Sequence, residues 1–570
     1  MSAKKEKLII YQALVRLFGN SNPTRQPYGT IETNGCGKMS DFSEIALRSI
    51  QQLGANYIWY TGLLQQASAT DYSQYGIPRQ HPEVLKGFAG SPYAITDYYA
   101  VSADLADDPA HRMEEFDALV RRTHRVGLRM LIDFVPNHVA REYHSVMAPK
   151  GVEDLGAMDD RSKAFDPQNN FYYCPGEPLH MQNVNGTDNV NQEPEKHYQE
   201  MPAKVSGNDV FHAWPSVNDW YETVKLNYGV DYQGGGRYCF DPIPSTWYKM
   251  LHILLYWAGK GVDGFRCDMV FMVPVDFWHW AIPQVKEQYP KVIFIAEIYD
   301  PAIYRSYLNY GGFDYLYDKV GLYDTLRAIV ECRESASAIT RCWQSVQDIQ
   351  PQLLNFLENH DEQRVASDFF AGSAQKALPA FVVSCLMHTN PFMLYFGQEL
   401  GERGMDQEGF SGRDGRTTIF DYWSVETIAG WKGKDAKWRR HHLPKEQREL
   451  REYYTRIFEI AREHPAIDRG SFYDLTYCNY NREGYDVHRQ FSFLRRFGRE
   501  VLLVVANFDS DAKQLSINVP EDAWEYVGLK SKNRHIQDLI SGEWDYKYHD
   551  TTKPFECRVP GYGAVVLKLQ

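Results

Sequence analysis

An alternation of short apolar runs with amphipathic segments constrains the fold of this chain more than any other feature of its sequence. Eight runs have the composition of buried strands: Ile9–Phe18, Tyr57–Leu64, Arg129–His138, Val262–Met269, Val292–Tyr299, Tyr315–Val320, Leu353–Asp361 and Phe392–Glu399. Several are almost continuously apolar, as strands covered on both faces of a parallel sheet must be. Between them, Arg112–Gly127 and Ser245–Gly261 place apolar residues on one helical face. Eight strands that alternate with helices predict an α/β fold, a closed (β/α)8 TIM barrel, rather than an open doubly wound sheet.

Two parts of the chain depart from this alternation. Residues 139–244 are rich in Asn, Gly, Pro, Tyr and acidic residues and lack a strong period, and a barrel does not need a structureless connection of that length. After a long helical stretch at Lys445–His464, short runs of period two indicate an antiparallel β-sandwich. The sequence therefore predicts a barrel formed by residues 1–138 and 245–464, a domain inserted after the third strand at 139–244, and a C-terminal antiparallel β-sandwich at 465–570.

The composition narrows the partners that this chain can have. Its 74 acidic and 61 basic residues give a formal net charge of −13, which argues against a nucleic-acid partner. Its 39 Tyr, 29 Phe and 13 Trp provide flat amphipathic faces that suit sugar rings. No apolar run approaches the ~18 residues that cross a bilayer, and Gln12 and Arg16 interrupt the first run too early for a signal peptide. We expect a cytoplasmic protein without a membrane partner, provided that no leader has been removed; the sequence indicates no oligomeric state.

Charged residues gather where the predicted strands end. The third, fourth, fifth and seventh strands end in Asp133-Phe-Val-Pro-Asn137-His138, Gly264-Phe-Arg266-Cys-Asp268, Ala296-Glu297-Ile298 and Glu358-Asn359-His360-Asp361. A lone aspartate at a strand end more often caps a loop or a helix. Carboxylates at the ends of four strands that share one rim, together with an arginine and two histidines, are not explained by capping. Because the active sites of TIM barrels lie at the carboxyl ends of the strands, this rim is the predicted active site.

The pairing of carboxylates suits the hydrolysis of an acetal, which needs one protonated and one ionised carboxyl group beside the bond. Asp268 and Glu297 belong to adjacent predicted strands, about 4.8 Å apart in sheet spacing. This is compatible with the ~5–5.5 Å separation of enzymes that retain the anomeric configuration. Arg266 lies two residues before Asp268, so both side chains leave the strand on the same face, and the guanidinium would keep Asp268 ionised. Glu297, in a drier and anion-rich site, suits the acid.

At these residues the chain resembles the α-amylase superfamily of glycoside hydrolases (glycoside hydrolase family 13). The four strand-end strings are similar to the four signature regions of that family in order and spacing, and the stretches at 54–59, 395–399 and 559–564 agree as well. The resemblance implies that Asp268 is the nucleophile, that Glu297 is the general acid/base and that Asp361 stabilises the oxocarbenium-like transition state. It implies an α-glucan or malto-oligosaccharide substrate.

The same resemblance implies roles for the residues around the substrate. His138 and His360 would hydrogen-bond sugar hydroxyls, Arg266 would orient the nucleophile, and Asp133 would support the site. Tyr93 would stack on the sugar ring, although packing within a region rich in aromatic residues is its alternative role.

Two departures from the family pattern concern the acceptor side and the metal. Where family α-amylases often carry a Lys-His pair after the nucleophile, this chain has Phe271 and Met272, so the acceptor subsites should differ and a drier acceptor side would disfavour water. No cofactor is required for the chemistry, but the resemblance implies Asn137 as a candidate ligand of a structural Ca²⁺. A hydrogen bond from Asn137 to the backbone of the insertion is the alternative that we favour.

We therefore expect a retaining glycosidase that hydrolyses α-1,4-glucosidic bonds of α-glucans or maltodextrins through a covalent glycosyl-Asp268 intermediate. The alternative is a transglycosylase that passes the same intermediate to a sugar acceptor. A metal-dependent hydrolase with His138, Asp133, Glu297 and His360 as ligands is disfavoured because the chain has no HxH or HExxH pattern at these positions. A catalytically inactive sugar-binding subunit on the same fold is disfavoured because all three carboxylates are present.

Overall fold

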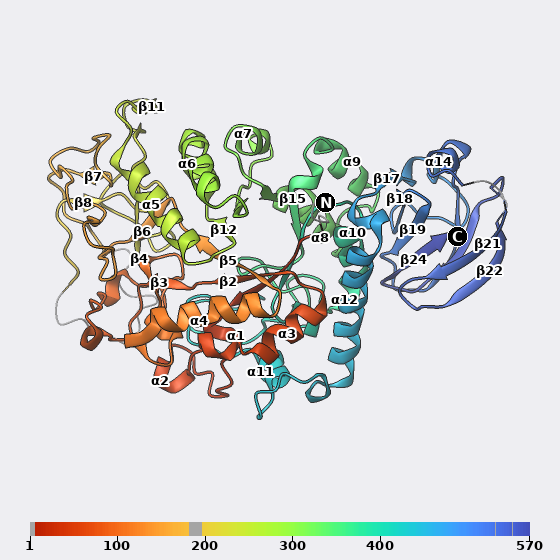
Figure 1. The fold of residues 1–570 in the computed structure, drawn as a ribbon, viewed down its shortest axis with the longest axis horizontal. Helices are drawn as coiled ribbons and strands as arrows, with labels where there is room; N and C mark the ends of the chain where they lie inside the picture. Colours follow the sequence, from red (N-terminus) through yellow and green to blue (C-terminus); the bar gives the residue numbers. More distant parts are fainter. Residues whose placement is uncertain (1–5, 182–196, 530–531, 550, 570) are drawn as a thin grey trace.

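Eight parallel strands close into a barrel at the core of the molecule (Figure 1). In the computed structural model, which describes residues 6–181, 197–529, 532–549 and 551–569, β1 pairs with both β16 and β2 and so closes the ring. The barrel strands are β1 (Ile9–Leu14), β2 (Tyr57–Thr61), β5 (Arg129–Phe134), β12 (Gly264–Cys267), β13 (Ile293–Ala296), β14 (Tyr315–Tyr317), β15 (Leu353–Phe356) and β16 (Phe392–Tyr395). All eight predicted strands are confirmed, each inside the apolar run that predicted it. The strands are shorter than the runs because the last residues of each run leave the sheet and form the rim.

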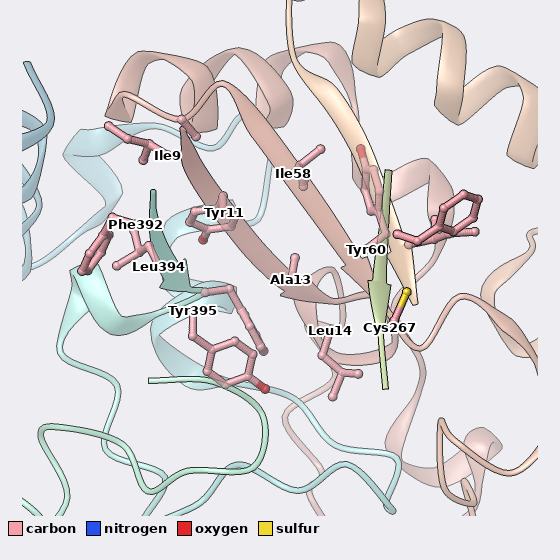
Figure 2. Close-up of a cluster of buried hydrophobic side chains, with 14 of the residues drawn as sticks. Ile9, Tyr11, Ala13, Leu14, Ile58, Tyr60, Cys267, Phe392, Leu394 and Tyr395 are labelled. Carbon is pink, nitrogen blue, oxygen red and sulfur yellow. The ribbon is translucent and has the colours of Figure 1, made fainter. Parts of the chain in front are cut away.

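The period of two along each barrel strand separates two apolar cores. The barrel interior is filled by one set of side chains, which includes Ile10, Trp59, Leu131, Ile295, Leu354 and Met393. The opposite set belongs to the core beneath the helices, and Figure 2 shows Ile9, Tyr11 and Ala13 of β1 with Ile58 and Tyr60 of β2 and Phe392 and Leu394 of β16. Both faces of the strands are therefore buried, which explains why the runs are apolar without alternation.

Helices cover the outside of the barrel. The longer ones are α3 (Glu44–Leu53), α4 (Arg112–Arg125), α5 (Ser245–Gly259), α6 (Val275–Gln288), α10 (Leu378–Leu386) and α12 (Lys445–Glu463). The three helical stretches predicted from the sequence agree with α4, α5 and α12 to within two residues. Within the described ranges, no helix is both long enough and apolar enough to cross a membrane.

The chain between β5 and α5 leaves the barrel and forms three small antiparallel sheets. They pair β6 (His138–Ala140) with β9 (Thr223–Lys225), β7 (Tyr173–Cys174) with β8 (Ala203–Lys204), and β10 (Val230–Asp231) with β11 (Arg237–Tyr238). Residues 182–196 of the predicted insertion lie outside the described ranges, and its boundaries stay a prediction. A second excursion, which the sequence did not predict, pairs β3 (Leu64–Gln66) with β4 (Ile95–Val101), and the connection between these two strands carries Tyr93.

The C-terminal part is antiparallel, as predicted. A six-stranded sheet has the order β17 (Ser471–Asp474), β18 (Gln490–Phe497), β19 (Glu500–Asn507), β24 (Gly563–Leu569), β21 (Lys532–Asp538) and β22 (Trp544–His549). A second sheet pairs β20 (Lys513–Ile517) with β23 (Phe555–Val559). Apolar residues of both sheets, such as Leu503 and Leu515, share one core that is separate from that of the barrel. This part lies beside the barrel, next to α10 and α12 (Figure 1).

Candidate active site

The inward-facing positions of three neighbouring strands change from apolar to charged toward their carboxyl ends. On β13, Ile295 belongs to the barrel interior and Glu297 follows two residues later; on β5, Asp133 likewise follows an inward-facing leucine. Arg266 of β12 lies in register with Asp133 on one side and Ile295 on the other. Because residues two apart share one face of a strand, these charged side chains point into the barrel mouth. Asp268 joins them immediately beyond the end of β12.

Arg266 connects the carboxyl groups of this cluster. Its side chain is 1% exposed, its Nη1 donates a hydrogen bond of 2.8 Å to Oδ1 of Asp268, and its Nη2 lies 2.5 Å from Oε1 of Glu297. Its Nε donates to the hydroxyl of Tyr317 at 3.2 Å. Its guanidinium carbon also lies over three rings, 5.2 to 5.6 Å from the centroids of Trp59, Tyr93 and Tyr317. Its Nη1 also lies 3.5 Å from Oδ1 of Asp133, so one rigidly held cation serves three carboxyl groups from neighbouring strands.

Glu297 is held by two further donors. Its Oε1 accepts a hydrogen bond of 2.6 Å from the hydroxyl of Tyr299, and its Oε2 accepts one of 2.8 Å from the backbone N–H of Met269. Met269 itself adopts a left-handed backbone conformation with φ of 43°. Within the described part of the chain, Nη2 of Arg266 makes no aligned hydrogen bond despite its closeness to Glu297. Of the two carboxyl groups of Asp268 and Glu297, Asp268 therefore receives the aligned hydrogen bond of the guanidinium.

The third carboxylate lies at the end of β15 beside a histidine with fixed orientation. His360 Nε2 is 2.5 Å from the hydroxyl of Tyr93 and 3.0 Å from Oδ2 of Asp361, and Nδ1 is 2.9 Å from Nε2 of Gln12. The rings of His360 and Tyr93 stack at 5.3 Å. Both nitrogens of His360 therefore already have protein partners. The side chain of Asp361 remains 40% exposed and faces the cavity.

Burial dominates the ionisation of the acidic residues. It raises the pKa of Asp133 to about 6 and also raises the pKa values of Asp268 and Glu297, while Arg266 opposes each of these rises. Burial and then the Glu297 carboxylate raise the pKa of Asp361 as well. Carboxyl groups that crowd one cation cannot all be ionised, so the site can hold protonated and ionised carboxyl groups side by side.

The two histidines are neutral. Burial lowers the pKa of His138 to about 3, helped by the charges of Lys225 and Lys86, and burial followed by Arg266 lowers the pKa of His360 well below its usual value. Neutral imidazoles can donate or accept hydrogen bonds with hydroxyl groups without adding charge to the site.

The cluster opens into a cavity of about 510 Å³, a size typical of small-molecule sites. Among the predicted site residues, Asp268, Glu297, Asp361, His138 and Tyr93 line it. Arg266, Asp133 and His360 lie beneath these residues and are buried. Trp59 Nε1 and the backbone N–H of Gly62 donate to Asp133 at 3.1 and 3.2 Å, which holds that carboxylate in place.

Several lining residues were not predicted from the sequence. They are Lys86, Trp220, Glu222, Tyr299, Lys319 and Phe420. Tyr299 could have been found, because it lies two residues after Glu297 at the same strand end. Lys319 could have been found in the same way, because it lies two residues after β14 and within the run that predicted that strand. The others come from the excursions and from long connections, where no period indicates which side chains face the cavity.

Phe271 and Met272 lie on the short helical turn at 270–272 that follows Asp268. Phe271 is 37% exposed, and its ring approaches that of Tyr299 edge-on with centroids 6.4 Å apart. Tyr299 lines the cavity, so Phe271 extends the aromatic surface outward from one of its walls.

Asn137 lies outside the cavity and donates a hydrogen bond to the backbone of the insertion, which is the alternative to a Ca²⁺ ligand given above. Its Nδ2 donates to the backbone oxygen of Gly207 in the insertion at 2.8 Å, and its Oδ1 accepts a hydrogen bond of 2.9 Å from the ammonium of Lys225. A divalent cation at this oxygen would meet that ammonium, so the residues present do not fit Ca²⁺ at Asn137. Among the described residues, no group of three or more His, Cys, Asp or Glu side chains could hold a metal ion.

Comparison with known proteins identifies relatives of the whole barrel. The sequence model of the family described as alpha amylase, catalytic domain, matches residues 16–455. Maltase 1 of Drosophila virilis is 22% identical over 554 residues, which covers 84% of this chain and 78% of the maltase. An alpha-1,4-glucan:maltose-1-phosphate maltosyltransferase of Cereibacter sphaeroides is 42% identical, but only over 57 residues, 10% of each chain. The crystal structure of an alpha-amylase from H. orenii has a TM-score of 0.63 at 18% identity and covers 100% of both chains, a likeness of fold.

Proposed function

Because this chain belongs to the α-amylase family of glycoside hydrolases, we propose that it is a retaining glycosidase that hydrolyses α-1,4-glucosidic bonds of α-glucans or maltodextrins. The observation that carries the proposal is the contact of Asp268 and Glu297 with the same guanidinium of Arg266. Two carboxyl groups within reach of one side chain suit the ~5–5.5 Å separation of double displacement better than the ~6.5–9.5 Å of inversion.

In the proposed reaction, the Glu297 carboxyl donates its proton to the glycosidic oxygen while the Asp268 carboxylate attacks the anomeric carbon. The bond from that carbon to the leaving sugar breaks as the bond to Asp268 forms. The Glu297 carboxylate then takes a proton from water, and the hydroxide displaces Asp268 with a second inversion, which gives net retention. Asp361 faces the cavity and would stabilise the positive charge that develops on the sugar ring.

The charge of the cavity supports a neutral substrate. Lys86 and Lys319 line it, but their ammonium groups lie 3.2 Å from Glu222 and 3.4 Å from Glu362, two acids that also line it. The cavity therefore offers no uncompensated cation within the described residues, and a phosphorylated sugar donor would meet the carboxylates of the reaction centre. A neutral glucan avoids that repulsion.

A transglycosylase is the second candidate, and Phe271 is the observation that favours it. An exposed aromatic ring beside Tyr299 can stack on an acceptor sugar and exclude water from the intermediate. Incubation of maltotriose at high concentration discriminates between the two: products longer than maltotriose support transfer, and shorter sugars alone reject it.

The substitution Asp268→Asn tests the hydrolase. Loss of the attacking carboxylate should lower kcat/KM on malto-oligosaccharides by at least about 10³-fold. In the unchanged enzyme, proton NMR of the first products should show the α-anomer before mutarotation. Asp276→Asn, the same chemical change on α6 outside the cavity, is the control and should keep the activity. Substantial turnover by Asp268→Asn, or β-anomers as first products, would contradict the proposal.

A further inference from the structure

A deeply buried lysine lies at the junction between the barrel and the inserted segment. Lys225 ends β9, is 1% exposed and lies in register with His138 of β6. Its Nζ is 2.5 Å from Oδ1 of Asp209 and donates to Oδ1 of Asn137 at 2.9 Å. Its ammonium also lies 5.3 Å from the ring centroid of Tyr232. A buried charge is tolerated only with such partners, and these come from both sides of the junction.

The partners of Lys225 lead directly to the cavity wall. Asn137 follows β5 and is held at both ends of its amide, by Lys225 at Oδ1 and by the backbone oxygen of Gly207 at Nδ2. Its backbone oxygen accepts from the N–H of Leu226 at 2.8 Å, the residue after Lys225. The packing is close, because a Cβ at Gly207 would come within 3.0 Å of the Cβ of His138. His138, the next residue after Asn137, lines the cavity.

We propose that the ammonium of Lys225 holds the inserted segment against the end of β5 and, through Asn137, positions His138 at the cavity. In this proposal the ammonium provides the positive charge at the junction, and no metal ion is needed there. Lys225 does not belong to the lining of the cavity, so it is a positioning residue. The ammonium of Lys225 occupies the position from which Ca²⁺ would contact Asn137, so the junction is stabilised without binding a metal ion. The inference deepens the proposed function, because it assigns how one wall of that site is held.

Chelation of the full-length protein tests the metal-free part of the proposal. The melting temperature and kcat/KM should be the same after exhaustive treatment with EDTA and after addition of millimolar CaCl₂. A loss on chelation that Ca²⁺ restores would overturn the proposal.

Substitution of the lysine tests its positioning role, with Lys204→Ala as the matched control. Lys204 is a partly buried lysine of the insertion, its side chain 19% exposed and 3.5 Å from Glu200, and its ammonium donates to the backbone oxygen of Arg141 rather than to Asn137. Lys225→Ala should lower the melting temperature and raise KM by at least about fivefold, whereas Lys204→Ala should lower the melting temperature alone. Ethylammonium chloride should restore part of the KM of Lys225→Ala, and tetramethylammonium chloride, which cannot donate hydrogen bonds, should not. An equal KM in the two variants, or the absence of rescue, would overturn the proposal.

A second pair of variants covers the case in which Lys225→Ala does not fold. Lys225→Arg keeps a cation and Lys225→Met keeps the length without the charge, so the arginine variant should melt at the higher temperature. Equal melting temperatures would show that the charge is not what holds the junction. These measurements need no substrate, so they remain decisive even if the protein proves inactive on α-glucans, an outcome that would reject the proposed function instead.

Discussion

Asp268 and Glu297 are both almost fully buried and both touch Arg266, yet the proposed reaction needs one of them ionised and the other protonated. The geometry of one guanidinium separates them, because its aligned hydrogen bond goes to Asp268 and its close contact with Glu297 is not aligned. Charge-assisted hydrogen bonds are strongest when they are directional, so the ionised form is favoured more at Asp268. The surrounding carboxylates and tyrosines in turn raise the pKa of Arg266, against the lowering by burial, so the guanidinium stays charged.

Tyr299→Phe should move the alkaline limb of the pH profile of kcat/KM to higher pH. The hydroxyl of Tyr299 donates to Glu297 and is one of the influences that lower the pKa of that carboxyl group, whose net shift is upward because of burial. Its removal therefore raises the pKa of Glu297 further, and the acid stays protonated to a higher pH. We expect kcat at the optimum to stay within about tenfold, since the proton donor itself remains. Tyr310→Phe, which removes an exposed hydroxyl that bonds Asp276, is the control; a limb in Tyr299→Phe that is unmoved or moves to lower pH would argue against Glu297 as the acid.

At the scale of the elements, the site depends on how closely β5, β12 and β13 approach one another. Gly264 opens β12 and lies in register with Leu131 of β5 and Ile293 of β13. A Cβ at this position would lie 2.6 Å from the backbone oxygen of Ile293 and 2.7 Å from a methyl carbon of Leu131. The glycine thus allows the spacing at which Asp133, Arg266 and Glu297 meet.

Gly264→Ala should destabilise the protein and impair the site together. The methyl group must push a neighbouring strand aside, at a cost of about 1–3 kcal/mol in the free energy of unfolding. Since the strands that move carry Asp133 and Glu297, kcat should fall as well, which steady-state kinetics at a temperature well below the melting transition would measure. Gly430→Ala is the matched control: this glycine lies inside α11 (Glu426–Lys432) with nothing within 4 Å of an added Cβ, so the change should stabilise by about 0.5–1 kcal/mol. Equal activity and stability in the two variants would refute this account of strand spacing.

The elements that could be predicted from the sequence are those whose two faces are buried. The barrel strands show as apolar runs, and the shared face of Arg266 and Asp268 follows from the period of two. No comparable signal exists for Lys86 or Trp220, because they lie in irregular connections without a period of apolar residues. The contact of Lys225 with Asn137 joins residues 88 positions apart through one ammonium group, and a lone lysine in a polar stretch gives no sign of burial.

At the scale of the whole molecule, a buried arginine helps to join the C-terminal sheet to the barrel. Arg495 of β18 is 1% exposed, and its hydrogen bonds to residues that the structure describes all go to backbone oxygens. They reach Met387 just after α10, at 2.8 Å, and Ala466, Ile467 and Gly470 in and after α13 (Pro465–Asp468), at 2.9 to 3.0 Å. Burial without an acidic partner among these contacts lowers the pKa of Arg495 to about 9. The guanidinium donates hydrogen bonds to carbonyl groups that would otherwise be buried without partners. Such unpaired groups would lower the free energy of unfolding.

Arg495→Met should therefore loosen the C-terminal sheet while the reaction centre stays intact. Removal of a buried hydrogen-bonded charge costs about 3–5 kcal/mol where its partners are left unpaired, so scanning calorimetry should show a lower melting temperature. Trypsin should also cut more quickly near Arg469, where α13 leads into β17. Arg495 does not belong to the cavity lining, so kcat of the folded enzyme should change by less than about twofold, within the range of substitutions away from the site.

Arg499→Met, at the exposed turn after β18, is the control and should melt as the unchanged protein does. If both variants melted alike, the junction would be held by its other contacts, such as the hydrogen bonds of Thr340 and Trp343 to Asp474. If Arg495→Met lost its activity below the melting transition, the C-terminal sheet would be shaping the barrel mouth as well.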